Sequence, residues 1–219
     1  MSKGVFITGT DTGIGKTVIS CGLLKNFNKQ GWRTAAMKPV ASGAGYVDGK
    51  LRNEDALALQ QAASEQWPYD LINPYVFEPA VAPHLAAAQA GVEIRLDRIR
   101  LAYEQLSANV DVTVVEGVGG WLVPLNRTDN VADLAVSLEL PVILVVGIRL
   151  GCLNHALLTE DSIQRKGVKL IGWIANMIDP EFTSAEDNIE TLRRKMTVPL
   201  LGVNLYQGVE AISFDVGML

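Results

Sequence analysis

The chain has 219 residues, 48% of them hydrophobic and 20% charged, and its formal net charge is -5 at pH 7. This composition is typical of a globular protein with a sizeable core, and the acidic balance does not favour nucleic-acid binding. No apolar run reaches the roughly 18 residues of a membrane span, and we expect no signal peptide. Cys21 and Cys152 lie far apart, which predicts reduced thiols, a cytoplasmic location and no Cys/His metal cluster.

Short apolar runs alternate with longer amphipathic segments along the chain. The apolar runs cover residues 4–8, 34–38, 111–116, 141–147, 169–176 and 199–204. The amphipathic segments, which predict helices, cover residues 16–29, 54–63, 95–107, 154–166 and 184–195. Because the runs are apolar throughout rather than alternating, they predict strands covered on both faces. The expected fold is α/β, with a mostly parallel central sheet, helices on both faces and a single domain over residues 1–219.

The first apolar run leads into GTDTGIGKTVIS, residues 9–20. This stretch is similar to a phosphate-binding loop, whose usual spelling is G-x-x-x-x-G-K-[ST]. Thr10 holds the place of the first glycine, and Gly9 lies one residue too early. The glycines still let the backbone approach an anion, and a helix starting at Lys16 directs free N–H groups toward it. We therefore expect a nucleotide-phosphate site, with Lys16 on terminal phosphate oxygens and the Thr17 hydroxyl on Mg²⁺.

Charged and polar side chains also follow later predicted strands, namely Lys38, Glu116 and Asn176. Ligands of parallel sheets bind beyond the carboxyl ends of the strands, so these residues are candidates for the same site. Lys38, stiffened by Pro39, would suit an anionic acceptor or a transferring phosphoryl group. Glu116 is a candidate ligand of Mg²⁺. Asp55 is another, although it would equally complement the dipole at its helix N-terminus.

The remaining polar and aromatic residues predict no nucleophilic catalytic set. His84 and His155 are expected to be structural, and Asn154 is a possible cap for the helix that contains His155. The glycine-rich segment 40–53 predicts a loop. Trp121 follows another glycine-rich stretch and is expected to pack in the core or to line a pocket.

Five blocks of the sequence together resemble the dethiobiotin synthetase family of biotin biosynthesis. They are GTDTGIGKT, KPVASG, LRNEDALAL, VVEGVGGWLVPL and LPVILVVGIRLGCLNHALLT, and the likeness covers roughly residues 1–176. The extra residue in the phosphate loop is the family's own form. Related switch and partitioning ATPases resemble KGG-x-GK[ST], and Asp11 stands in the place of their signature lysine. The resemblance implies a P-loop NTPase-like fold.

The resemblance implies an ATP-dependent ring closure of 7,8-diaminononanoate with CO2. One amine adds CO2 to form a carbamate, whose oxygen takes the γ-phosphoryl group of ATP. The second amine attacks the resulting carbamic-phosphoric anhydride, and dethiobiotin, ADP and phosphate are released. The resemblance also implies a homodimer with a shared site, because the substrate carboxylate would bind a helix N-terminus of the other subunit.

The resemblance assigns roles to single residues as well. Catalysis would rest on Lys38, Lys16 and Thr12, and Mg²⁺ would be held by Thr17, Asp55 and Glu116. ATP would be bound by Gly13, Ile14, Gly15, Lys16, Thr17, Asp55, Glu116, Gly117, Gly119 and Asn176, the last of these at adenine. The substrate would be bound by Thr12 and Ser42 and, across the dimer, by Gly151, Cys152 and Asn154.

The likeness to the family weakens near the C-terminus. Asn176-Met177 stands where family members often show Asn-Asp, residues 204–206 replace a Pro-x-Leu stretch, and the tail that follows is short. These positions would line the adenine side of the site. The preference among ATP, GTP and CTP therefore stays open.

Three other functions stay open as alternatives. A switch or partitioning ATPase would hydrolyse ATP slowly, but it fits poorly with Asp11 and Lys38. A small-molecule kinase would need an arginine-rich lid, yet Arg52 is the only arginine between Arg33 and Arg95. An amidotransferase-type synthetase would normally bring a glutaminase domain, for which the chain has no room.

Overall fold

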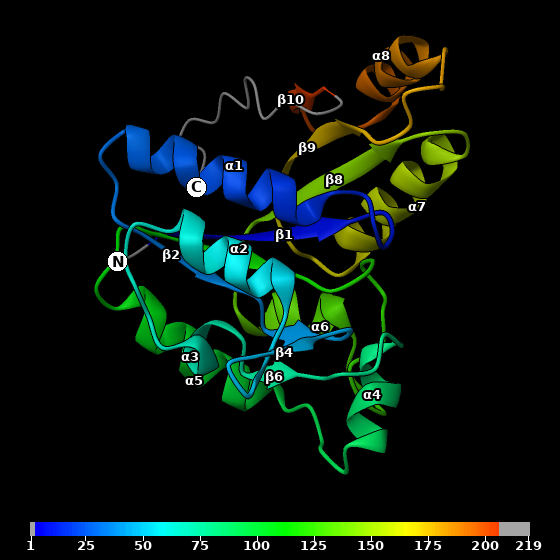
Figure 1. The fold of residues 1–219 in the computed structure, drawn as a ribbon. Coiled ribbons are helices and arrows are strands. Elements are labelled where there is room, and N and C mark those ends of the chain that lie inside the picture. The colour runs from blue at the N-terminus through cyan, green and yellow to red at the C-terminus, as the bar shows by residue number, and fades with distance from the viewer. Residues whose placement is uncertain (1–2, 206–219) are drawn as a thin grey trace.

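The computed structural model describes residues 3–205 and is built around a six-stranded sheet (Figure 1). The strand order is β10-β9-β8-β1-β7-β2, and every neighbouring pair is parallel. The strands are β1 (Lys3–Gly9), β2 (Thr34–Met37), β7 (Val112–Glu116), β8 (Val142–Ile148), β9 (Leu170–Met177) and β10 (Leu200–Asn204). Each predicted strand is confirmed to within one residue at either end.

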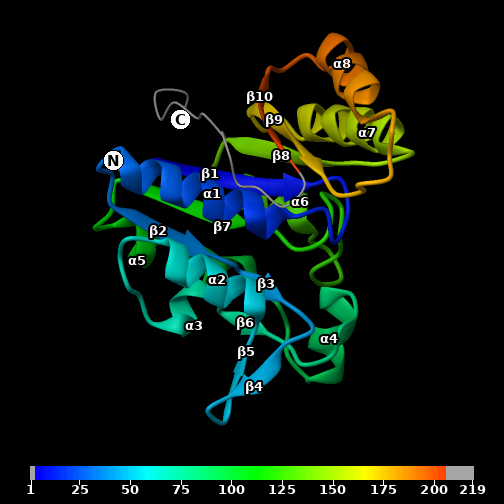
Figure 2. The same cartoon turned by 45° about the horizontal axis from the view of Figure 1, so that its top comes forward.

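Helices cover both faces of this sheet, as predicted (Figures 1 and 2). One face carries α1 (Lys16–Lys29) and α2 (Glu54–Ala62). The other face carries α5 (Leu96–Ser107), α6 (Val131–Ser137), α7 (Cys152–Arg165) and α8 (Ala185–Lys195). Successive strand residues point to opposite faces, so Val5 and Ile7 pack on the α1 side whereas Phe6 packs on the other. Burial on both sides explains why the strands are apolar throughout.

The helix predicted at residues 154–166 is α7, and it begins earlier than expected. Its N-cap is Gly151, whose φ of 92° is a left-handed angle that favours glycine. No side chain caps this helix, and Asn154 lies exposed within its first turn. The prediction that Asn154 caps the helix is therefore wrong.

The segment between β2 and α5 contains short elements that the sequence did not predict. They are α3 (Tyr69–Ile72), α4 (Pro83–Gln89), β3 (Val40–Ala41) paired with β6 (Tyr75–Val76), and β4 (Gly45–Val47) paired with β5 (Lys50–Arg52).

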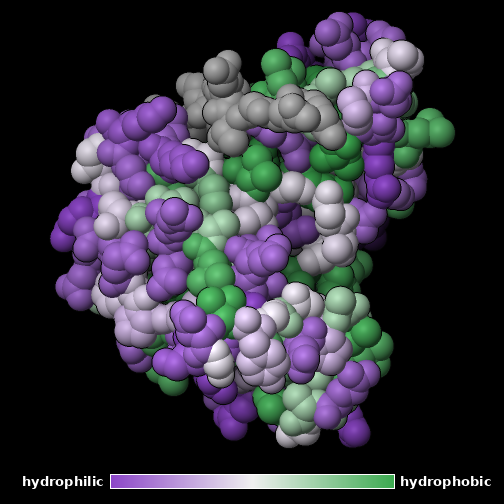
Figure 3. Space-filling view, in the orientation of Figure 1, coloured by the Kyte–Doolittle hydropathy of each residue, from purple (hydrophilic) through white to green (hydrophobic). Residues whose placement is uncertain are grey.

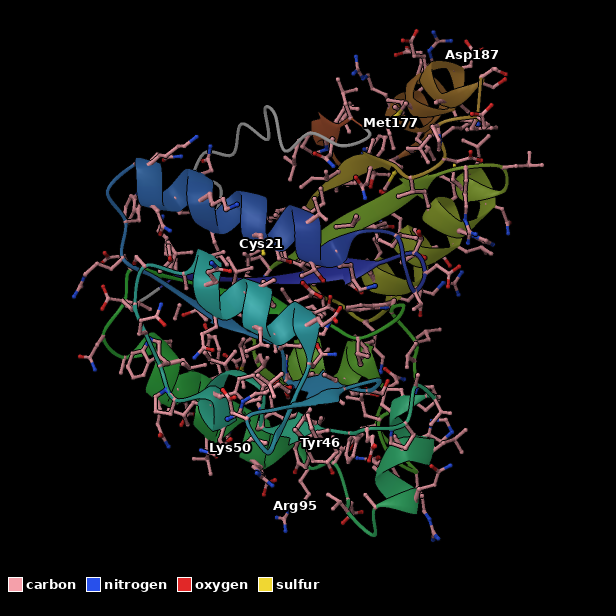
Figure 4. The ribbon with its side chains drawn as sticks, in the orientation of Figure 1. Cys21, Tyr46, Lys50, Arg95, Met177 and Asp187 are labelled. Atoms are coloured by element: carbon pink, nitrogen blue, oxygen red, sulfur yellow. The ribbon has the colours of Figure 1, made fainter. Side chains whose placement is uncertain are left out.

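The prediction of a plain loop at residues 40–53 is wrong in part, because β4 and β5 form an antiparallel hairpin that projects from the body (Figure 2). Its turn residues Asp48 and Gly49 have φ angles of 49° and 72°, as tight two-residue hairpins require. Figure 4 shows Tyr46 and Lys50 on the two sides of this hairpin.

No helix of residues 3–205 combines the length and apolar character needed to cross a membrane. Both cysteines are free; Cys152 is buried, and Cys21 is half-buried on α1 (Figure 4). Burial, together with the negative charge of Glu116, raises the pKa of Cys21 to about 11. The reactive thiolate form of Cys21 is therefore scarce at neutral pH.

Strand register gathers the predicted site residues at the carboxyl edge of the sheet. Ile7 in β1 pairs with Glu116 at the end of β7, and Met37 at the end of β2 pairs with Val115. Lys38 follows Met37 directly, so it leaves the sheet beside Glu116. The loop between β1 and α1 leaves the same edge where β1 lies between β7 and β8. This is the edge at which parallel sheets bind ligands.

Candidate active site

A cavity of about 670 Å³ opens at this carboxyl edge. Its polar wall comes from the loop before α1, from the ends of β2 and β7 and from the start of α2. Its apolar wall comes from Ala41, Ala80, Val81, Ala82, Pro83, Val118 and Val123. The cavity therefore combines charged groups with apolar lining residues.

The phosphate loop has the backbone that its glycines permit. Gly13 and Gly15 have φ angles of 73° and 82°, and Gly15 is the N-cap of α1. No side chain caps α1, so the N–H groups of its first turn are available to an anion. A Cβ at Gly15 would lie 2.1 Å from Nδ2 of Asn176, whereas a Cβ at Gly13 would meet no heavy atom within 4 Å.

Lys16 is buried at the start of α1, and its Nζ donates a hydrogen bond of 2.8 Å to the carbonyl oxygen of Asp11. Burial, together with the positive charge of Lys38, lowers the pKa of Lys16 to about 8. The loop therefore contains an ammonium group that would gain stability from any anion that entered.

Lys38 lies in the opposite electrostatic surroundings. It is 3% exposed, and its Nζ lies 2.5 Å from Oε1 of Glu116, 3.2 Å from Oδ2 of Asp55 and 3.3 Å from the carbonyl oxygen of Gly117. Burial alone would lower the pKa of Lys38, but the charges and hydrogen bonds of Glu116 and Asp55 raise it above the ordinary value. Lys38 is therefore positively charged at neutral pH.

Thr17, Asp55 and Glu116 supply an all-oxygen donor set beside Lys38. The Thr17 hydroxyl donates to Oε1 of Glu116 over 2.9 Å. Glu116 is fully buried, and its other oxygen, Oε2, has no hydrogen-bond partner among the described residues. Burial opposes ionisation of Asp55, but the charge and hydrogen bonds of Lys38 and Thr17 lower its pKa below the ordinary value.

Mg²⁺ suits this donor set, because it prefers oxygen ligands and usually takes only one or two carboxylates. No group of three or more His, Cys, Asp or Glu side chains that could hold a metal occurs in residues 3–205. Two carboxylates and a hydroxyl would leave further positions to phosphate oxygens and water. The buried Oε2 of Glu116, which has no partner among the described residues, is an oxygen that such a cation would bind.

Asp55 is freed for such a role by its neighbour. Asn53 is the N-cap of α2, and its side chain accepts a hydrogen bond from the backbone N–H of Ala56 over 3.2 Å. Asp55 itself points to Lys38. Capping of α2 thus belongs to Asn53, a residue that the sequence-based site omitted, while Asp55 lies in the first turn of α2 and also complements the helix dipole, the other alternative left by the sequence.

Thr12 and Ser42, the predicted substrate contacts, line the cavity, with Thr12 exposed and Ser42 half-buried. Gly119 also lines it, with a φ of 61°. Gly117 is buried below, where its N–H donates to the carbonyl of Ile7.

The other predicted residues do not line this cavity. Asn176 is buried, donates through Nδ2 to the carbonyl of Ile14 over 2.7 Å and accepts from Nδ2 of Asn204 over 2.7 Å. It therefore holds the phosphate loop against β9 and β10. Gly151, Cys152 and Asn154 lie at the start of α7, where Cys152 is buried. In the structure of residues 3–205, none of those three residues lines the cavity of its own chain.

Several residues lie at or near the site without a sequence signal. The apolar wall from Ala80 to Pro83 carries no recognisable motif.

Trp121 is buried and lines a separate shallow pocket with Thr10 and Leu158. His84 lies in another pocket beside α4, and His155 is exposed on α7. The sequence-based view that neither histidine belongs to the site agrees with these positions.

Known proteins share both the sequence and the fold. A family model described as an AAA domain matches residues 3–204. The ATP-dependent dethiobiotin synthetase of Xylella fastidiosa (strain 9a5c) is 54% identical over 197 residues, which cover 90% of this chain and 87% of the relative. The enzyme of the same name from Aromatoleum aromaticum is 53% identical over 198 residues, which cover 90% and 88%.

Solved structures match at far lower identity. The septum site-determining protein MinD of Pyrococcus horikoshii, solved with Mg-ADP, has a TM-score of 0.58 at 18% identity and covers 93% of this chain and 81% of its own. FtsY of Thermotoga maritima has a TM-score of 0.56 at 16% identity, and this chain spans only 64% of it. These likenesses show a P-loop NTPase-like fold and nothing further. The sequence matches decide the family: the chain belongs to the ATP-dependent dethiobiotin synthetases.

Proposed function

We propose that the chain closes the ring of dethiobiotin from 7,8-diaminononanoate, CO2 and ATP, working as a single domain over its 219 residues. The observation that carries the proposal is the convergence of two lysines and two carboxylates on one cavity that apolar residues also line. An anionic carbamate that meets the phosphates of ATP requires positive charge beside it. The hydrocarbon chain of the substrate suits the apolar lining residues. Two free cysteines support a reducing, cytoplasmic setting.

ATP would place its phosphates at the N-terminus of α1. The backbone N–H groups of Gly13, Ile14 and Gly15 and the ammonium of Lys16 would bind them. The glycine-rich turn at Gly117 and Gly119 would follow the phosphates on the other side. Asn176 would face adenine through Oδ1, which already accepts from Asn204 and can accept a second hydrogen bond, while its Nδ2 continues to donate to Ile14.

Mg²⁺ would be held by Thr17, Asp55 and Glu116 together with phosphate oxygens. When bound, it would neutralise charge on the transferring phosphoryl group. Lys38 would then turn from the carboxylates toward the substrate, because the carboxylates would have another cation partner.

The residues of this chain would mainly position the reacting groups and stabilise their negative charge. One amine of the substrate, once neutral, adds to CO2, and the lost proton leaves a carbamate anion. Lys38 and Lys16 would hold the carbamate beside the γ-phosphate, and Thr12 and Ser42 would donate hydrogen bonds to it. A carbamate oxygen attacks phosphorus while ADP leaves. The second amine then attacks the carbamate carbon, phosphate leaves and the cyclic urea closes.

A homodimer would complete the site. The N–H of Cys152 donates to the carbonyl of Arg149 over 3.1 Å, but the first turn of α7, which follows the left-handed Gly151, offers further N–H groups that no side chain caps, among them that of Asn154. These donors would bind the substrate carboxylate of the partner subunit. Leu122, Leu150 and Leu158 are 56%, 85% and 61% exposed, which suits a covered surface. Figure 3 shows hydrophobic residues at the surface where β8 leads into α7.

The test is phosphate release by the purified chain with diaminononanoate, bicarbonate and MgATP, accompanied by mass-spectrometric detection of dethiobiotin. We expect the rate to fall to background when any one component is omitted. A rate indifferent to the diamine would overturn the proposal. Replacing ATP by GTP or CTP in the same assay reports the base preference.

A nucleotide switch is the second candidate, and the fold likeness to MinD is what favours it. A switch would hydrolyse ATP slowly without the diamine, so the same assay separates the two functions. Asp11 in place of the signature lysine of such switches speaks against it.

A further inference from the structure

The phosphate loop is contacted by a side chain from another part of the sheet. Nη2 of Arg149 lies 2.5 Å from Oδ2 of Asp11 in the loop. Arg149 follows β8 directly, and β8 pairs with β1 up to Gly9. The backbone N–H of Thr10 also donates to Val145 of β8 over 3.1 Å. Contacts from β8 and from Arg149, which follows it, therefore hold the loop.

Asp11 makes two further bonds inside the loop. Its Oδ1 accepts from the N–H of Thr12 over 2.7 Å, and its carbonyl oxygen accepts from Nζ of Lys16 over 2.8 Å. One residue thus orients the predicted substrate contact Thr12 and the phosphate-binding Lys16. A shift of the Asp11 carboxylate would therefore displace both Thr12 and Lys16.

The tip of the loop has little packing of its own. Thr12 and Gly13 are exposed, and a Cβ at Gly13 would meet no heavy atom within 4 Å. The other side of the loop is better secured, because the buried amide of Asn176 binds Ile14. The ion pair with Arg149 therefore holds the part of the loop that packing does not stabilise.

We infer that Arg149 is a positioning residue that acts through Asp11 to hold the phosphate loop, and with it Lys16 and Thr12, in a nucleotide-ready conformation. The two side chains are 41% and 46% exposed. Exposed ion pairs add little to folding stability. The expected effect therefore falls on nucleotide binding rather than on the fold. The inference rests on the proposed ATP site.

The test is a double-mutant cycle with Arg149→Gln, Asp11→Asn and both together, measured as KM for ATP, as kcat and as ADP affinity by calorimetry. We expect each single change to raise KM for ATP by about three- to fivefold, with a smaller effect on kcat and an unchanged melting temperature. The double variant is expected to be no worse than the poorer single variant, because both changes break one contact. Arg149→Lys should restore most of the affinity.

A matched control is the ion pair of Arg33 and Asp111, which is also exposed but lies at the opposite edge of the sheet. Arg33→Gln should leave KM for ATP unchanged. Effects of Arg149→Gln that persist in full in the Asp11→Asn background would overturn the inference, because Arg149 would then contact the nucleotide directly. A KM within twofold of wild type, or a loss of melting temperature beyond that of Arg33→Gln, would also overturn it. Failure of the wild-type chain to bind ADP would instead refute the ATP site itself.

Discussion

The two lysines of the cavity lie on neighbouring elements but in opposite surroundings. Lys38 is flanked by two carboxylates, which raise its pKa, whereas Lys16 faces a backbone carbonyl, and burial lowers its pKa to about 8. Held between these carboxylates, Lys38 carries its charge at neutral pH. Lys16 carries a charge that an arriving phosphate stabilises. The difference separates a permanent electrostatic element of the site from one that responds to the nucleotide.

The largest expected effect comes from removing the permanent charge. Lys38→Ala should lower kcat by about 10³-fold, because a preorganised charge at the reacting groups is lost. ADP affinity should stay within about threefold, because Lys16 and the start of α1 still bind the phosphates. Steady-state kinetics and calorimetry measure the two quantities, and Lys169→Ala, an exposed lysine before β9, is the control. Retained turnover would remove Lys38 from the catalytic residues.

A smaller effect is expected from deforming the loop that contains Lys16. Gly15→Ala forces a left-handed φ of 82° on alanine and drives its Cβ against Asn176. The strain of about 1–3 kcal/mol should appear as a ten- to hundredfold loss of ADP affinity. Gly13→Ala has a similar φ but open space, so it should lose clearly less. Equal losses in the two variants would show that the contact with Asn176 is unimportant.

The smallest expected effect is a pH dependence that sharpens the contrast between the lysines. In the absence of divalent ions, ADP should bind the protonated form of Lys16, whose pKa in the free protein is about 8. Affinity should therefore be full below pH 7 and fall about tenfold between pH 7 and pH 9, as the free lysine loses its proton. The groups facing Lys16 are Lys38, Glu116, Asp55 and Asp11. Lys16→Arg should remove the pH dependence, and a flat profile in the wild type would contradict the assignment.

The sheet and its long helices could be predicted because their signals are local. Apolar runs of five to eight residues and amphipathic segments of ten or more specify β1, β8, α1 and α8 with little ambiguity. The elements α3 and α4 are too short for a period to be read, and the hairpin of β4 and β5 is mostly exposed. The start of α7 was misplaced because a left-handed glycine, and not a polar side chain, defines it.

Many residues of the candidate site could be predicted from motifs, but the hydrogen bonds and ion pairs between them could not. Lys16, Thr17, Lys38 and Glu116 follow strands or open a helix, which the sequence displays. The bond between Lys38 and Glu116 depends on the register of β2 against β7, residues that are 78 positions apart. The pairing of Arg149 with Asp11 spans 138 positions and leaves no pattern in either neighbourhood.

The contact between Gly15 and Asn176 has a consequence for sequence drift within the family. Position 15 can accept a side chain only if position 176 becomes smaller, because the two occupy the same space. A shorter residue at 176 would in turn release Ile14 and leave Asn204 without its partner. Substitutions at these sites are therefore conditional on one another. Divergence in this region should proceed through linked exchanges at positions 15, 176 and 204 rather than through single replacements.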